Sequence, residues 1–332
     1  MKDIYDKLYL QQTLSIEEAY KLMNKLALGE LNESQIASLL TVYLMRSISI
    51  EEFMGFAQGL LAHRVDLAPL QVYNPIDIVG TGGDGKNTFN ISTLACFVVA
   101  AAGYKVAKHG NYGVSSISGS STVMEELGVS FSSDLDKLER SLVETNITFL
   151  HAPLFNSGMM AASAVRKELG VRTLFNMLGP VINPIQSKRI VLGVYNLKMA
   201  RMYQYMYQKR DTDFIIVHSL DGSDEISLTN EFKVIDKQGE LIQSPEALGF
   251  KRCKERDLYG GQKAKEAAQI FLDVLNNRAT DAQLSSVVAN AAYAIQLIEP
   301  SQPLENSIAQ AKEAIDSGAA ARVFNQFKEL NS

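Results

Sequence analysis

The stretch between residues 76 and 93 constrains the fold of this chain more than any other. An apolar run at 76–79 leads into four glycines within residues 80–85, and a helical pattern begins near Ile91. Glycine lets the backbone approach a ligand closely and point successive N–H groups at it. The N-terminus of the following helix also favours negative charge. The stretch predicts a strand, an anion-binding loop and a helix, although a simple strand-to-helix turn would leave a similar pattern.

Two well-known phosphate-binding loops fit this stretch poorly. Residues 80–86 match G-x-x-x-x-G-K, but the Ser or Thr that should follow to bind magnesium is Asn87. The dinucleotide-binding motif needs an acidic residue at the end of a second strand about 20 residues further on. The chain has Lys105 and Lys108 in that region instead. We therefore expect neither a nucleoside triphosphate loop nor a dinucleotide loop.

Hydrophobic periodicity predicts a two-part organisation. About the first 65 residues show only helical spacing, and three capping boxes begin at Ser15, Asn32 and Ser49. Beyond residue 75 helical stretches alternate with short apolar runs at 76–79, 105–107, 147–150, 190–194 and 214–217. Such alternation is typical of βα units around a parallel sheet. We predict an α/β fold with a small N-terminal helical domain, 1–70, and a larger α/β domain with a mostly parallel central sheet, 71–332.

Charge and composition narrow the function classes. The formal net charge is -5 and no long Lys/Arg run occurs, so we expect no nucleic-acid partner. The longest apolar run, 94–102, is too short for a membrane span. Cys96 and Cys253 are far apart and suggest no disulfide framework. We expect a soluble, cytoplasmic protein that binds any polyanion locally, through backbone N–H groups, a few cations or a metal.

Motifs along nearly the whole chain carry a family resemblance. They are 80–84 (GTGGD) with 90–93 (NIST), 108–111 (KHGN) with serines at 115, 116, 118 and 120, 165–173 (VRKELGVRT) leading into 175–180 (FNMLGP) and 183–184 (NP), 221–225 (DGSDE), 260–261 (GG) and 290–292 (NAA). Taken together they resemble the motifs of the anthranilate phosphoribosyltransferases. The resemblance implies transfer of the 5-phosphoribosyl group from phosphoribosyl diphosphate to anthranilate, in tryptophan biosynthesis.

The same resemblance implies roles for individual residues. For the acceptor it implies Gly80, Asn111 and Arg166, and for two Mg²⁺ ions it implies Ser92 with Glu225 and Asp224 with Glu225. It implies no catalytic side chain, because positioning and metal ions supply the rate. The donor-binding residues that it implies are Gly80, Gly83, Asp84, Thr88, Asn90, Ile91, Ser92, Thr93, Lys108, His109, Gly110, Asn111, Ser115, Ser116 and Ser120.

Taken singly, several of these residues have ordinary alternatives. Lys108 alone would be a solvated surface lysine, and Arg166 alone a surface arginine on a helix. Asp224 with Glu225 alone would be an exposed acidic turn. Beside a polyanion, however, adjacent carboxylates need hard cations, and Mg²⁺ binds carboxylate and phosphate oxygens together. An arginine can likewise pair bidentately with an acceptor carboxylate.

Three places depart from the family pattern. Tyr112 stands where the family usually has Arg, and Ile117 where it usually has Lys. Residues 156–158 read Asn-Ser-Gly where the family has His-Pro-Ala. The first two departures remove cations near the donor, and the third lies on the acceptor side.

Other functions stay open at this point. One is a related phosphoribosyltransferase with another aromatic or heterocyclic acceptor. A second is a nucleoside phosphorylase, which uses free phosphate and which the Asp224–Glu225 pair argues against. A third is a paralogue that binds nucleic acid or a regulatory ligand, which the acidic balance and the Gly/Ser loops argue against.

Assembly can also be predicted. Tyr43, Phe53 and Phe56 are larger apolar side chains than three short helices can easily bury. Together with the resemblance, they predict that the N-terminal helices form a homodimer interface.

Overall fold

The computed structural model describes residues 1–113 and 119–332, and it divides into two compact units. The first, here called the helical unit, contains Met1–Leu67 and Ala152–Gln186. The second, here called the sheet unit, contains Ala68–His151 and Ser187–Ser332.

The helical unit begins with α1 (Lys2–Tyr9), which was not predicted from the sequence. The three predicted helices follow it as α2 (Ile16–Ala27), α3 (Glu33–Met45) and α4 (Ile50–Leu61). The three predicted capping boxes are present at Ser15, Asn32 and Ser49. Each box satisfies backbone donors of the first turn that would otherwise lack a partner, which fixes where each helix starts.

A buried ion pair ties α3 to α4. Glu52 is fully buried, and its carboxylate accepts hydrogen bonds from Arg46, Tyr43 and the backbone N–H of Leu14. Burial raises the pKa of Glu52, but the hydrogen bonds from Arg46, Ser49, Leu14 and Tyr43 outweigh it and leave that pKa below its ordinary value. A buried carboxylate is tolerated here because every oxygen is paired.

Two of the three aromatic side chains that predicted a dimer interface are buried within the chain itself. Phe53 and Phe56 are fully buried within the chain, and the Tyr43 ring packs edge-on against Phe56. Phe53 and Phe56 are therefore not available to a dimer interface.

The helical unit is completed by a segment from the middle of the chain. This segment forms α8 (Ala152–Phe155), α9 (Ser157–Ala161), α10 (Ser163–Leu169), α11 (Phe175–Leu178) and the 3₁₀ turn Gly179–Val181. A Cβ atom on Gly158 would lie 2.7 Å from the Ala27 Cβ and 2.8 Å from Leu60 Cδ2. The close fit explains why the units differ from the predicted division into 1–70 and 71–332: α9 packs on α2, and α10 on α3.

The sheet unit contains a seven-stranded sheet of order β3-β2-β1-β4-β5-β6-β7. Strands β1 to β5 are parallel, as predicted, and β6 and β7 add an antiparallel hairpin that the sequence analysis did not identify. The strands are β1 (Ile76–Gly80), β2 (Val106–Gly110), β3 (Ile147–His151), β4 (Arg189–Gly193), β5 (Asp213–Ser219), β6 (Phe232–Ile235) and β7 (Glu240–Gln243).

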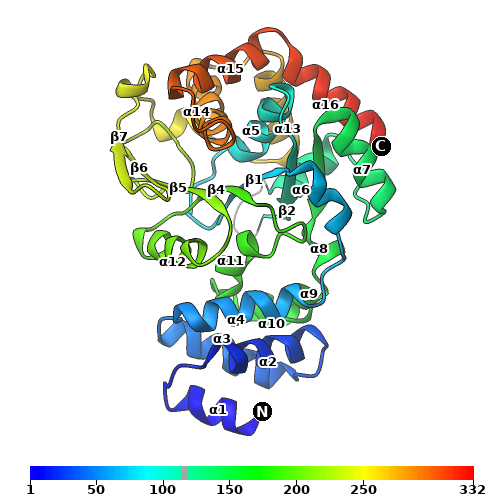
Figure 1. Cartoon of the computed structure of the whole chain (residues 1–332), viewed down its shortest axis with the longest axis vertical. Helices are drawn as coiled ribbons and strands as arrows, with labels where there is room; N and C mark the ends of the chain where they lie inside the picture. Colours follow the sequence, from blue (N-terminus) through cyan, green and yellow to red (C-terminus); the bar gives the residue numbers. More distant parts are fainter. Residues whose placement is uncertain (114–118) are drawn as a thin grey trace. The chain divides into compact units, whose positions relative to one another are not determined.

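Helices cover both faces of this sheet. Figure 1 shows α5 and α14 on one face and α12 on the other. Phe97 of α5 packs edge-on against Phe271, Phe324 and Phe327, which joins this face to the C-terminal helices. The helices are α5 (Ile91–Ala101), α6 (Ser120–Glu126), α7 (Leu135–Thr145), α12 (Leu197–Gln208), α13 (Ala264–Leu275), α14 (Asp281–Ile298), α15 (Leu304–Asp316) and α16 (Ala319–Leu330), with 3₁₀ turns at Ala68–Tyr73, Glu246–Leu248 and Glu255–Leu258.

The strand order locates the place where a ligand is expected. The chain runs from β1 outward to β2 and β3, and then returns to the other side of β1 for β4 and β5. In open α/β sheets, ligands bind at the carboxyl ends of the strands beside such a reversal. The reversal here lies between β1 and β4. Across the part of the chain that is described, no helix has the length and apolar character needed to cross a membrane.

Candidate functional site

Two neighbouring strands end in glycine, and an acidic segment lies directly over them. Gly80 of β1 pairs in register with Gly193 of β4. A Cβ on Gly80 would lie 2.6 Å from Asp224 Oδ2, and a Cβ on Gly193 would lie 1.6 Å from the Asp224 carbonyl oxygen. Only glycine permits this approach. The sequence analysis missed Gly193, although a glycine that closes an apolar strand was a usable signal.

Hydrogen bonds hold the backbone around Asp224 and Glu225. The Ser219 hydroxyl donates to the Glu225 carbonyl at 2.7 Å. Asn290 accepts from the Ile226 N–H at 3.1 Å and donates to the Ile226 carbonyl at 3.0 Å. Asn290, noted in the sequence only as part of a motif, thus fixes the residue that follows the two carboxylates.

The three carboxyl groups of the site are held in an environment that opposes their charge. Burial raises the pKa of Asp224 well above its ordinary value, and the charges of Glu225 and Asp84 raise it further. Burial raises the pKa of Glu225 to about 7, although Lys108 and Ser92 act in the opposite direction. Burial raises the pKa of Asp84 as well. A bound cation would stabilise the ionised forms of such groups.

These residues fit a magnesium ion that is shared with a phosphorylated ligand. Within residues 1–113 and 119–332, no three His, Cys, Asp or Glu side chains gather in a way that could hold a metal alone. Mg²⁺ is usually bound by one or two carboxylates together with substrate phosphates and water. Asp224 and Glu225 could provide the carboxylates, and Ser92 a hydroxyl group beside Glu225.

The glycine-rich loop between β1 and α5 is anchored at both ends. Near its start, the Gly82 N–H donates to Asp224 Oδ2 at 2.6 Å. Near its end, Asn87 donates to the Gly261 carbonyl at 2.7 Å and accepts from the Gly260 N–H at 2.7 Å. Thr88 forms a β-bridge with Tyr259. The Gly260–Gly261 motif therefore holds the far end of the loop, while Gly83 and Asp84 lie between the anchors.

The start of α5 faces the acidic segment. The Ser92 backbone N–H donates to Glu225 Oε1 at 3.2 Å, so the structure brings together two residues predicted to share an ion. Asn90 is the N-cap residue of α5, but its side chain does not cap the helix. Ile91 and Thr93 are buried in the first turn and support it from behind.

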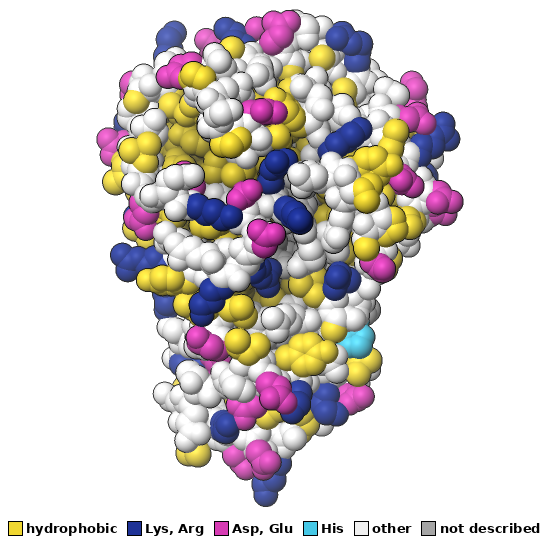
Figure 2. Space-filling model, in the orientation of Figure 1, with side chains coloured by type: hydrophobic (Ala, Val, Ile, Leu, Met, Phe, Trp, Pro, Cys, Tyr) yellow, Lys and Arg dark blue, Asp and Glu magenta, His cyan; other side chains and the backbone are white. Residues whose placement is uncertain are grey.

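Lys108 is a buried cation, not a solvated surface lysine. Its side chain is almost entirely covered, and its ammonium donates to the Ile78 carbonyl of β1 at 2.8 Å. Its charge also lowers the pKa of Glu225. A single buried cation can supply positive charge to a bound anion even where the protein surface is not basic. Figure 2 shows no uniformly basic region on the face that it displays, because Asp and Glu are interspersed with Lys and Arg.

Beyond β2, a second loop begins with His109, Gly110 and Asn111. His109 and Gly110 are buried at the end of the strand. The Asn111 N–H donates to Ser120 Oγ at 3.2 Å, and the Ser120 hydroxyl donates to the Asn111 carbonyl at 3.2 Å. Three residues discussed above lie outside the described residues: the predicted donor residues Ser115 and Ser116, and the departure at Ile117.

Tyr112 takes part in a polar and aromatic cluster. Its hydroxyl donates to Glu125 at 2.6 Å, and its ring meets the His151 ring edge-on at 5.0 Å. The His151 Nδ1 is 2.8 Å from Ser121 Oγ, and Phe131 stacks on the His151 ring. The departure at Tyr112 thus has local partners in this chain.

Arg166, the predicted acceptor residue, belongs to the helical unit. It lies on α10, half-buried, with its guanidinium 5.2 Å from the centre of the Phe175 ring. Burial lowers the pKa of Arg166. Among the described residues it forms no ion pair with a carboxylate, so its charge is available for an acidic ligand. In the 156–158 departure, Asn156 is buried and donates to the Ile182 carbonyl at 3.3 Å.

Comparisons with known proteins agree with this geometry. Residues 73–321 match the family model described as glycosyl transferase family, a/b domain, and residues 2–64 match the helical bundle domain of that family. An anthranilate phosphoribosyltransferase of Bacteroides thetaiotaomicron is 54% identical over 332 residues, which is 100% of each chain. One from Cytophaga hutchinsonii is 48% identical over 98% of this chain and 99% of its own.

Solved structures are similar over nearly the same length. The anthranilate phosphoribosyltransferase of Thermus thermophilus matches with a TM-score of 0.90 and 32% identity, over 99% of each chain. The Saccharomyces cerevisiae enzyme in complex with PRPP and Mg matches with a TM-score of 0.90 and 28% identity, over 99% of this chain and 96% of that one.

The close approach of the Asp224 backbone to Gly193 of β4 predicts what adding a methyl group at Gly193 would do. In Gly193→Ala, the new Cβ would lie 1.6 Å from the Asp224 carbonyl oxygen, where at least 3.0 Å is needed, so the acidic segment must move by more than an ångström. A displacement of that size can cost about a hundredfold or more in turnover. Steady-state kinetics of the variant measure this loss. Gly29→Ala is the control, because nothing lies within 4 Å of a Cβ there; its positive φ adds a backbone strain that Gly193 does not have, so the control also tests for simple destabilisation. Equal activity in the two variants would contradict the prediction.

Proposed function

Because this chain belongs to the anthranilate phosphoribosyltransferase family, we propose that it transfers the 5-phosphoribosyl group of phosphoribosyl diphosphate to the amine of anthranilate. The products are N-(5-phosphoribosyl)anthranilate and diphosphate, and the reaction belongs to tryptophan biosynthesis. The observation that carries the proposal is the placement of Asp224 and Glu225 over the ends of β1 and β4, beside the start of α5. That arrangement suits a donor with a diphosphate group.

The donor is bound mainly by backbone groups and small polar side chains. The N–H groups of the glycine-rich loop and of the first turn of α5 can point at phosphate oxygens. Lys108 contributes positive charge from β2. The full set proposed for the donor is Gly80, Gly83, Asp84, Thr88, Asn90, Ile91, Ser92, Thr93, Lys108, His109, Gly110, Asn111, Ser115, Ser116 and Ser120.

Two Mg²⁺ ions are proposed to bind with the donor. Ser92 and Glu225 would hold one, and Asp224 and Glu225 the other. Bound there, Mg²⁺ would neutralise the charge that develops on the departing diphosphate. The chain keeps the carboxylates in place through Gly80, Gly193 and Asn290.

The reaction needs no covalent nucleophile from the protein. The bond between ribose C1 and the diphosphate oxygen breaks while the anthranilate nitrogen bonds to C1 from the opposite face, and that nitrogen then loses a proton. The contribution of the chain is to orient the two substrates and to bind the charged groups.

Arg166 is proposed to recognise the carboxylate of anthranilate, with Gly80 and Asn111 also on the acceptor side. The aromatic ring of Phe175 restrains the guanidinium, and no neighbouring carboxylate among the described residues competes for it. A nucleoside phosphorylase is a weaker interpretation, because it would not require the buried carboxylates Asp224 and Glu225.

A homodimer is also proposed. Four exposed apolar side chains lie at the ends of α1 and α3, which pack together: Tyr9, Leu10, Leu44 and Met45. Leu10 and Met45 are 71% and 75% exposed. Exposed apolar side chains at the ends of two packed helices are candidates for an interaction site. A cytoplasmic location stays a prediction from the sequence.

The metal proposal predicts the behaviour of a double variant. Asp224→Ala with Glu225→Ala should remove stabilisation worth several kcal/mol from the leaving group, a loss of about a thousandfold or more in turnover. The assay follows the fall of anthranilate fluorescence with donor and Mg²⁺, and chelator should abolish the wild-type signal. Asp213→Ala, which removes an exposed carboxylate paired with Lys237, should behave as wild type. Full activity in chelator would remove the magnesium assignment.

The acceptor proposal predicts an asymmetric effect of Arg166→Ala. A charge-assisted contact is worth about 1.5–3 kcal/mol, so the use of anthranilate should fall roughly ten- to hundredfold. The KM for the donor should change much less. Two saturation series, one varying anthranilate and one varying the donor, measure both effects. An equal loss for the two substrates would contradict the assigned role, and a wild type that ignores anthranilate would contradict the function.

The dimer proposal predicts a change in mass. Sedimentation of the wild type at micromolar concentration should show a dimer, and Leu44→Asp with Met45→Asp should shift it to monomer by placing charges in the apolar patch. The matched control is Leu241→Asp with Ile242→Asp, on the exposed strand β7, which should leave the dimer intact. A monomeric wild type would overturn the proposal.

A further inference from the structure

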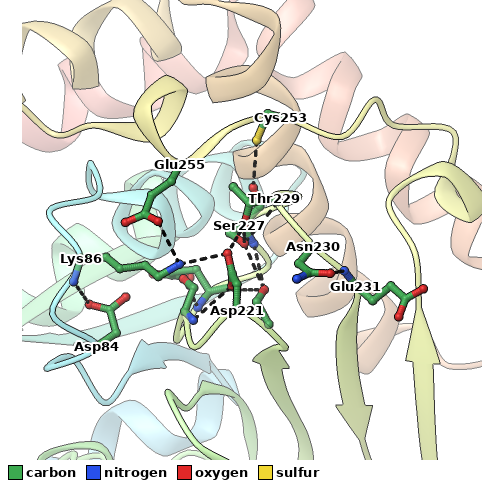
Figure 3. Close-up of polar contacts among 12 residues, drawn as sticks. Asp84, Lys86, Asp221, Ser227, Thr229, Asn230, Glu231, Cys253 and Glu255 are labelled. Carbon is green, nitrogen blue, oxygen red and sulfur yellow. Dashed lines mark hydrogen bonds and ion pairs between the residues drawn. The ribbon is translucent and has the colours of Figure 1, made fainter.

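Lys86, in the glycine-rich loop, has a role that the proposed binding set does not include. Its ammonium is 2.9 Å from Asp221 Oδ2 and 3.6 Å from Glu255 Oε2. The Lys86 side chain is only 12% exposed, and that of Asp221 only 21%. Figure 3 shows the lysine extending from its loop to a position between the two carboxylates. The loop is thus joined to a distant part of the sequence by a largely buried ion pair.

Asp221 begins the loop that carries Asp224 and Glu225. Its carboxylate accepts a hydrogen bond from the Thr229 hydroxyl as well as from Lys86. The Ser223 N–H donates to its other oxygen at 3.4 Å. Burial raises the pKa of Asp221, but the hydrogen bonds from Thr229 and Lys86 outweigh it and leave that pKa below its ordinary value. Asp221 is therefore an ionised anchor for both ends of its own loop.

A chain of hydroxyl groups continues from this anchor to Glu225. Thr229 Oγ1 is 2.7 Å from Ser227 Oγ, and Ser227 Oγ is 3.2 Å from Ser219 Oγ. Because the Thr229 hydroxyl donates to Asp221, the single proton of Ser227 is donated to Thr229 or to Ser219, one at a time. The Ser219 hydroxyl in turn donates to the Glu225 carbonyl at 2.7 Å. The pair between Lys86 and Asp221 is therefore connected to the backbone of a proposed metal-binding residue.

The backbone of Lys86 contacts the glycine-rich loop itself. Its N–H donates to Asp84 Oδ1 at 2.9 Å, which orients the carboxyl group in the middle of the loop (Figure 3). One residue thus fixes Asp84 through its main chain and Asp221 through its side chain.

The partial burial of this pair separates it from an ordinary surface ion pair. Lys237 and Asp213, in the same unit, have side chains that are 43% and 54% exposed. Exposed pairs contribute little, whereas the loss of one partner of a buried pair leaves the other charge uncompensated.

We propose that Lys86 and Asp221 are positioning residues, whose ion pair holds the glycine-rich loop and the 221–225 segment in the arrangement that binds the donor. In this role neither side chain needs to contact the substrate. The proposal rests on the proposed function and adds a structural link between its two halves, the phosphate loop and the metal-binding loop.

A double-mutant cycle tests the pair. Lys86→Ala and Asp221→Ala should each raise the donor KM about tenfold with little change in the anthranilate KM, and the double variant should be no worse than the worse single variant. Lys86→Arg should restore most of the donor affinity. Donor binding without anthranilate, measured by titration calorimetry with Mg²⁺, gives the same comparison without turnover. Lys237→Ala and Asp213→Ala form the matched control pair and should leave donor binding unchanged.

Other outcomes would overturn the proposal. If Lys86→Ala weakens donor binding while Asp221→Ala does not, Lys86 contacts the phosphates directly. If the variants only lower the thermal unfolding midpoint, with KM and donor affinity unchanged, the pair is structural. A wild type that binds the donor but ignores anthranilate would contradict the proposed function alone, because the calorimetric cycle would still report on the pair.

Discussion

The Asp224 peptide lies against the ends of β1 and β4, where no side chain larger than hydrogen fits at Gly80 or Gly193. The rest of the site depends on this contact. Gly80 and Gly193 are paired in the parallel ladder, so the two positions without a side chain lie next to each other and leave room for one peptide. The acidic segment can then reach the first turn of α5 and the glycine-rich loop together, through Ser92 and Gly82. The acidic segment therefore contacts both the N-terminus of α5 and the glycine-rich loop, and these two contacts hold the helix and the loop together.

Much of the sheet unit could be predicted from sequence because its signals are local. The strand, glycine loop and helix at 76–93 follow one another in the chain, and all five parallel strands coincide with apolar runs. Gly193 was missed because its significance depends on Asp224, which lies 31 residues further on and meets it only in the folded sheet. The burial of Lys108 was missed for a similar reason, since its partner is the Ile78 carbonyl of a neighbouring strand.

Only part of the helical unit could be predicted from the sequence. Its capping boxes were read correctly, because a box involves residues only three positions apart. The place of 152–186 in that unit could not be read, because the short helices there have few residues to display a period. Their assignment depends on fits such as Gly158 against Ala27 and Leu60, which only the folded unit reveals.

The helical unit is built from two segments that are far apart in the sequence, and this affects how it can form during protein synthesis. Its first segment ends at Leu67, yet the second emerges only after the whole stretch Ala68–His151, which belongs to the other unit. Ribosomes add about 5 to 20 residues per second, so α2 and α4 wait on the order of ten seconds for the helix that covers Ala27 and Leu60. Throughout that interval part of their apolar surface has no native partner. The N-terminal helices are therefore made first but completed only after the first three strands of the sheet have been synthesised.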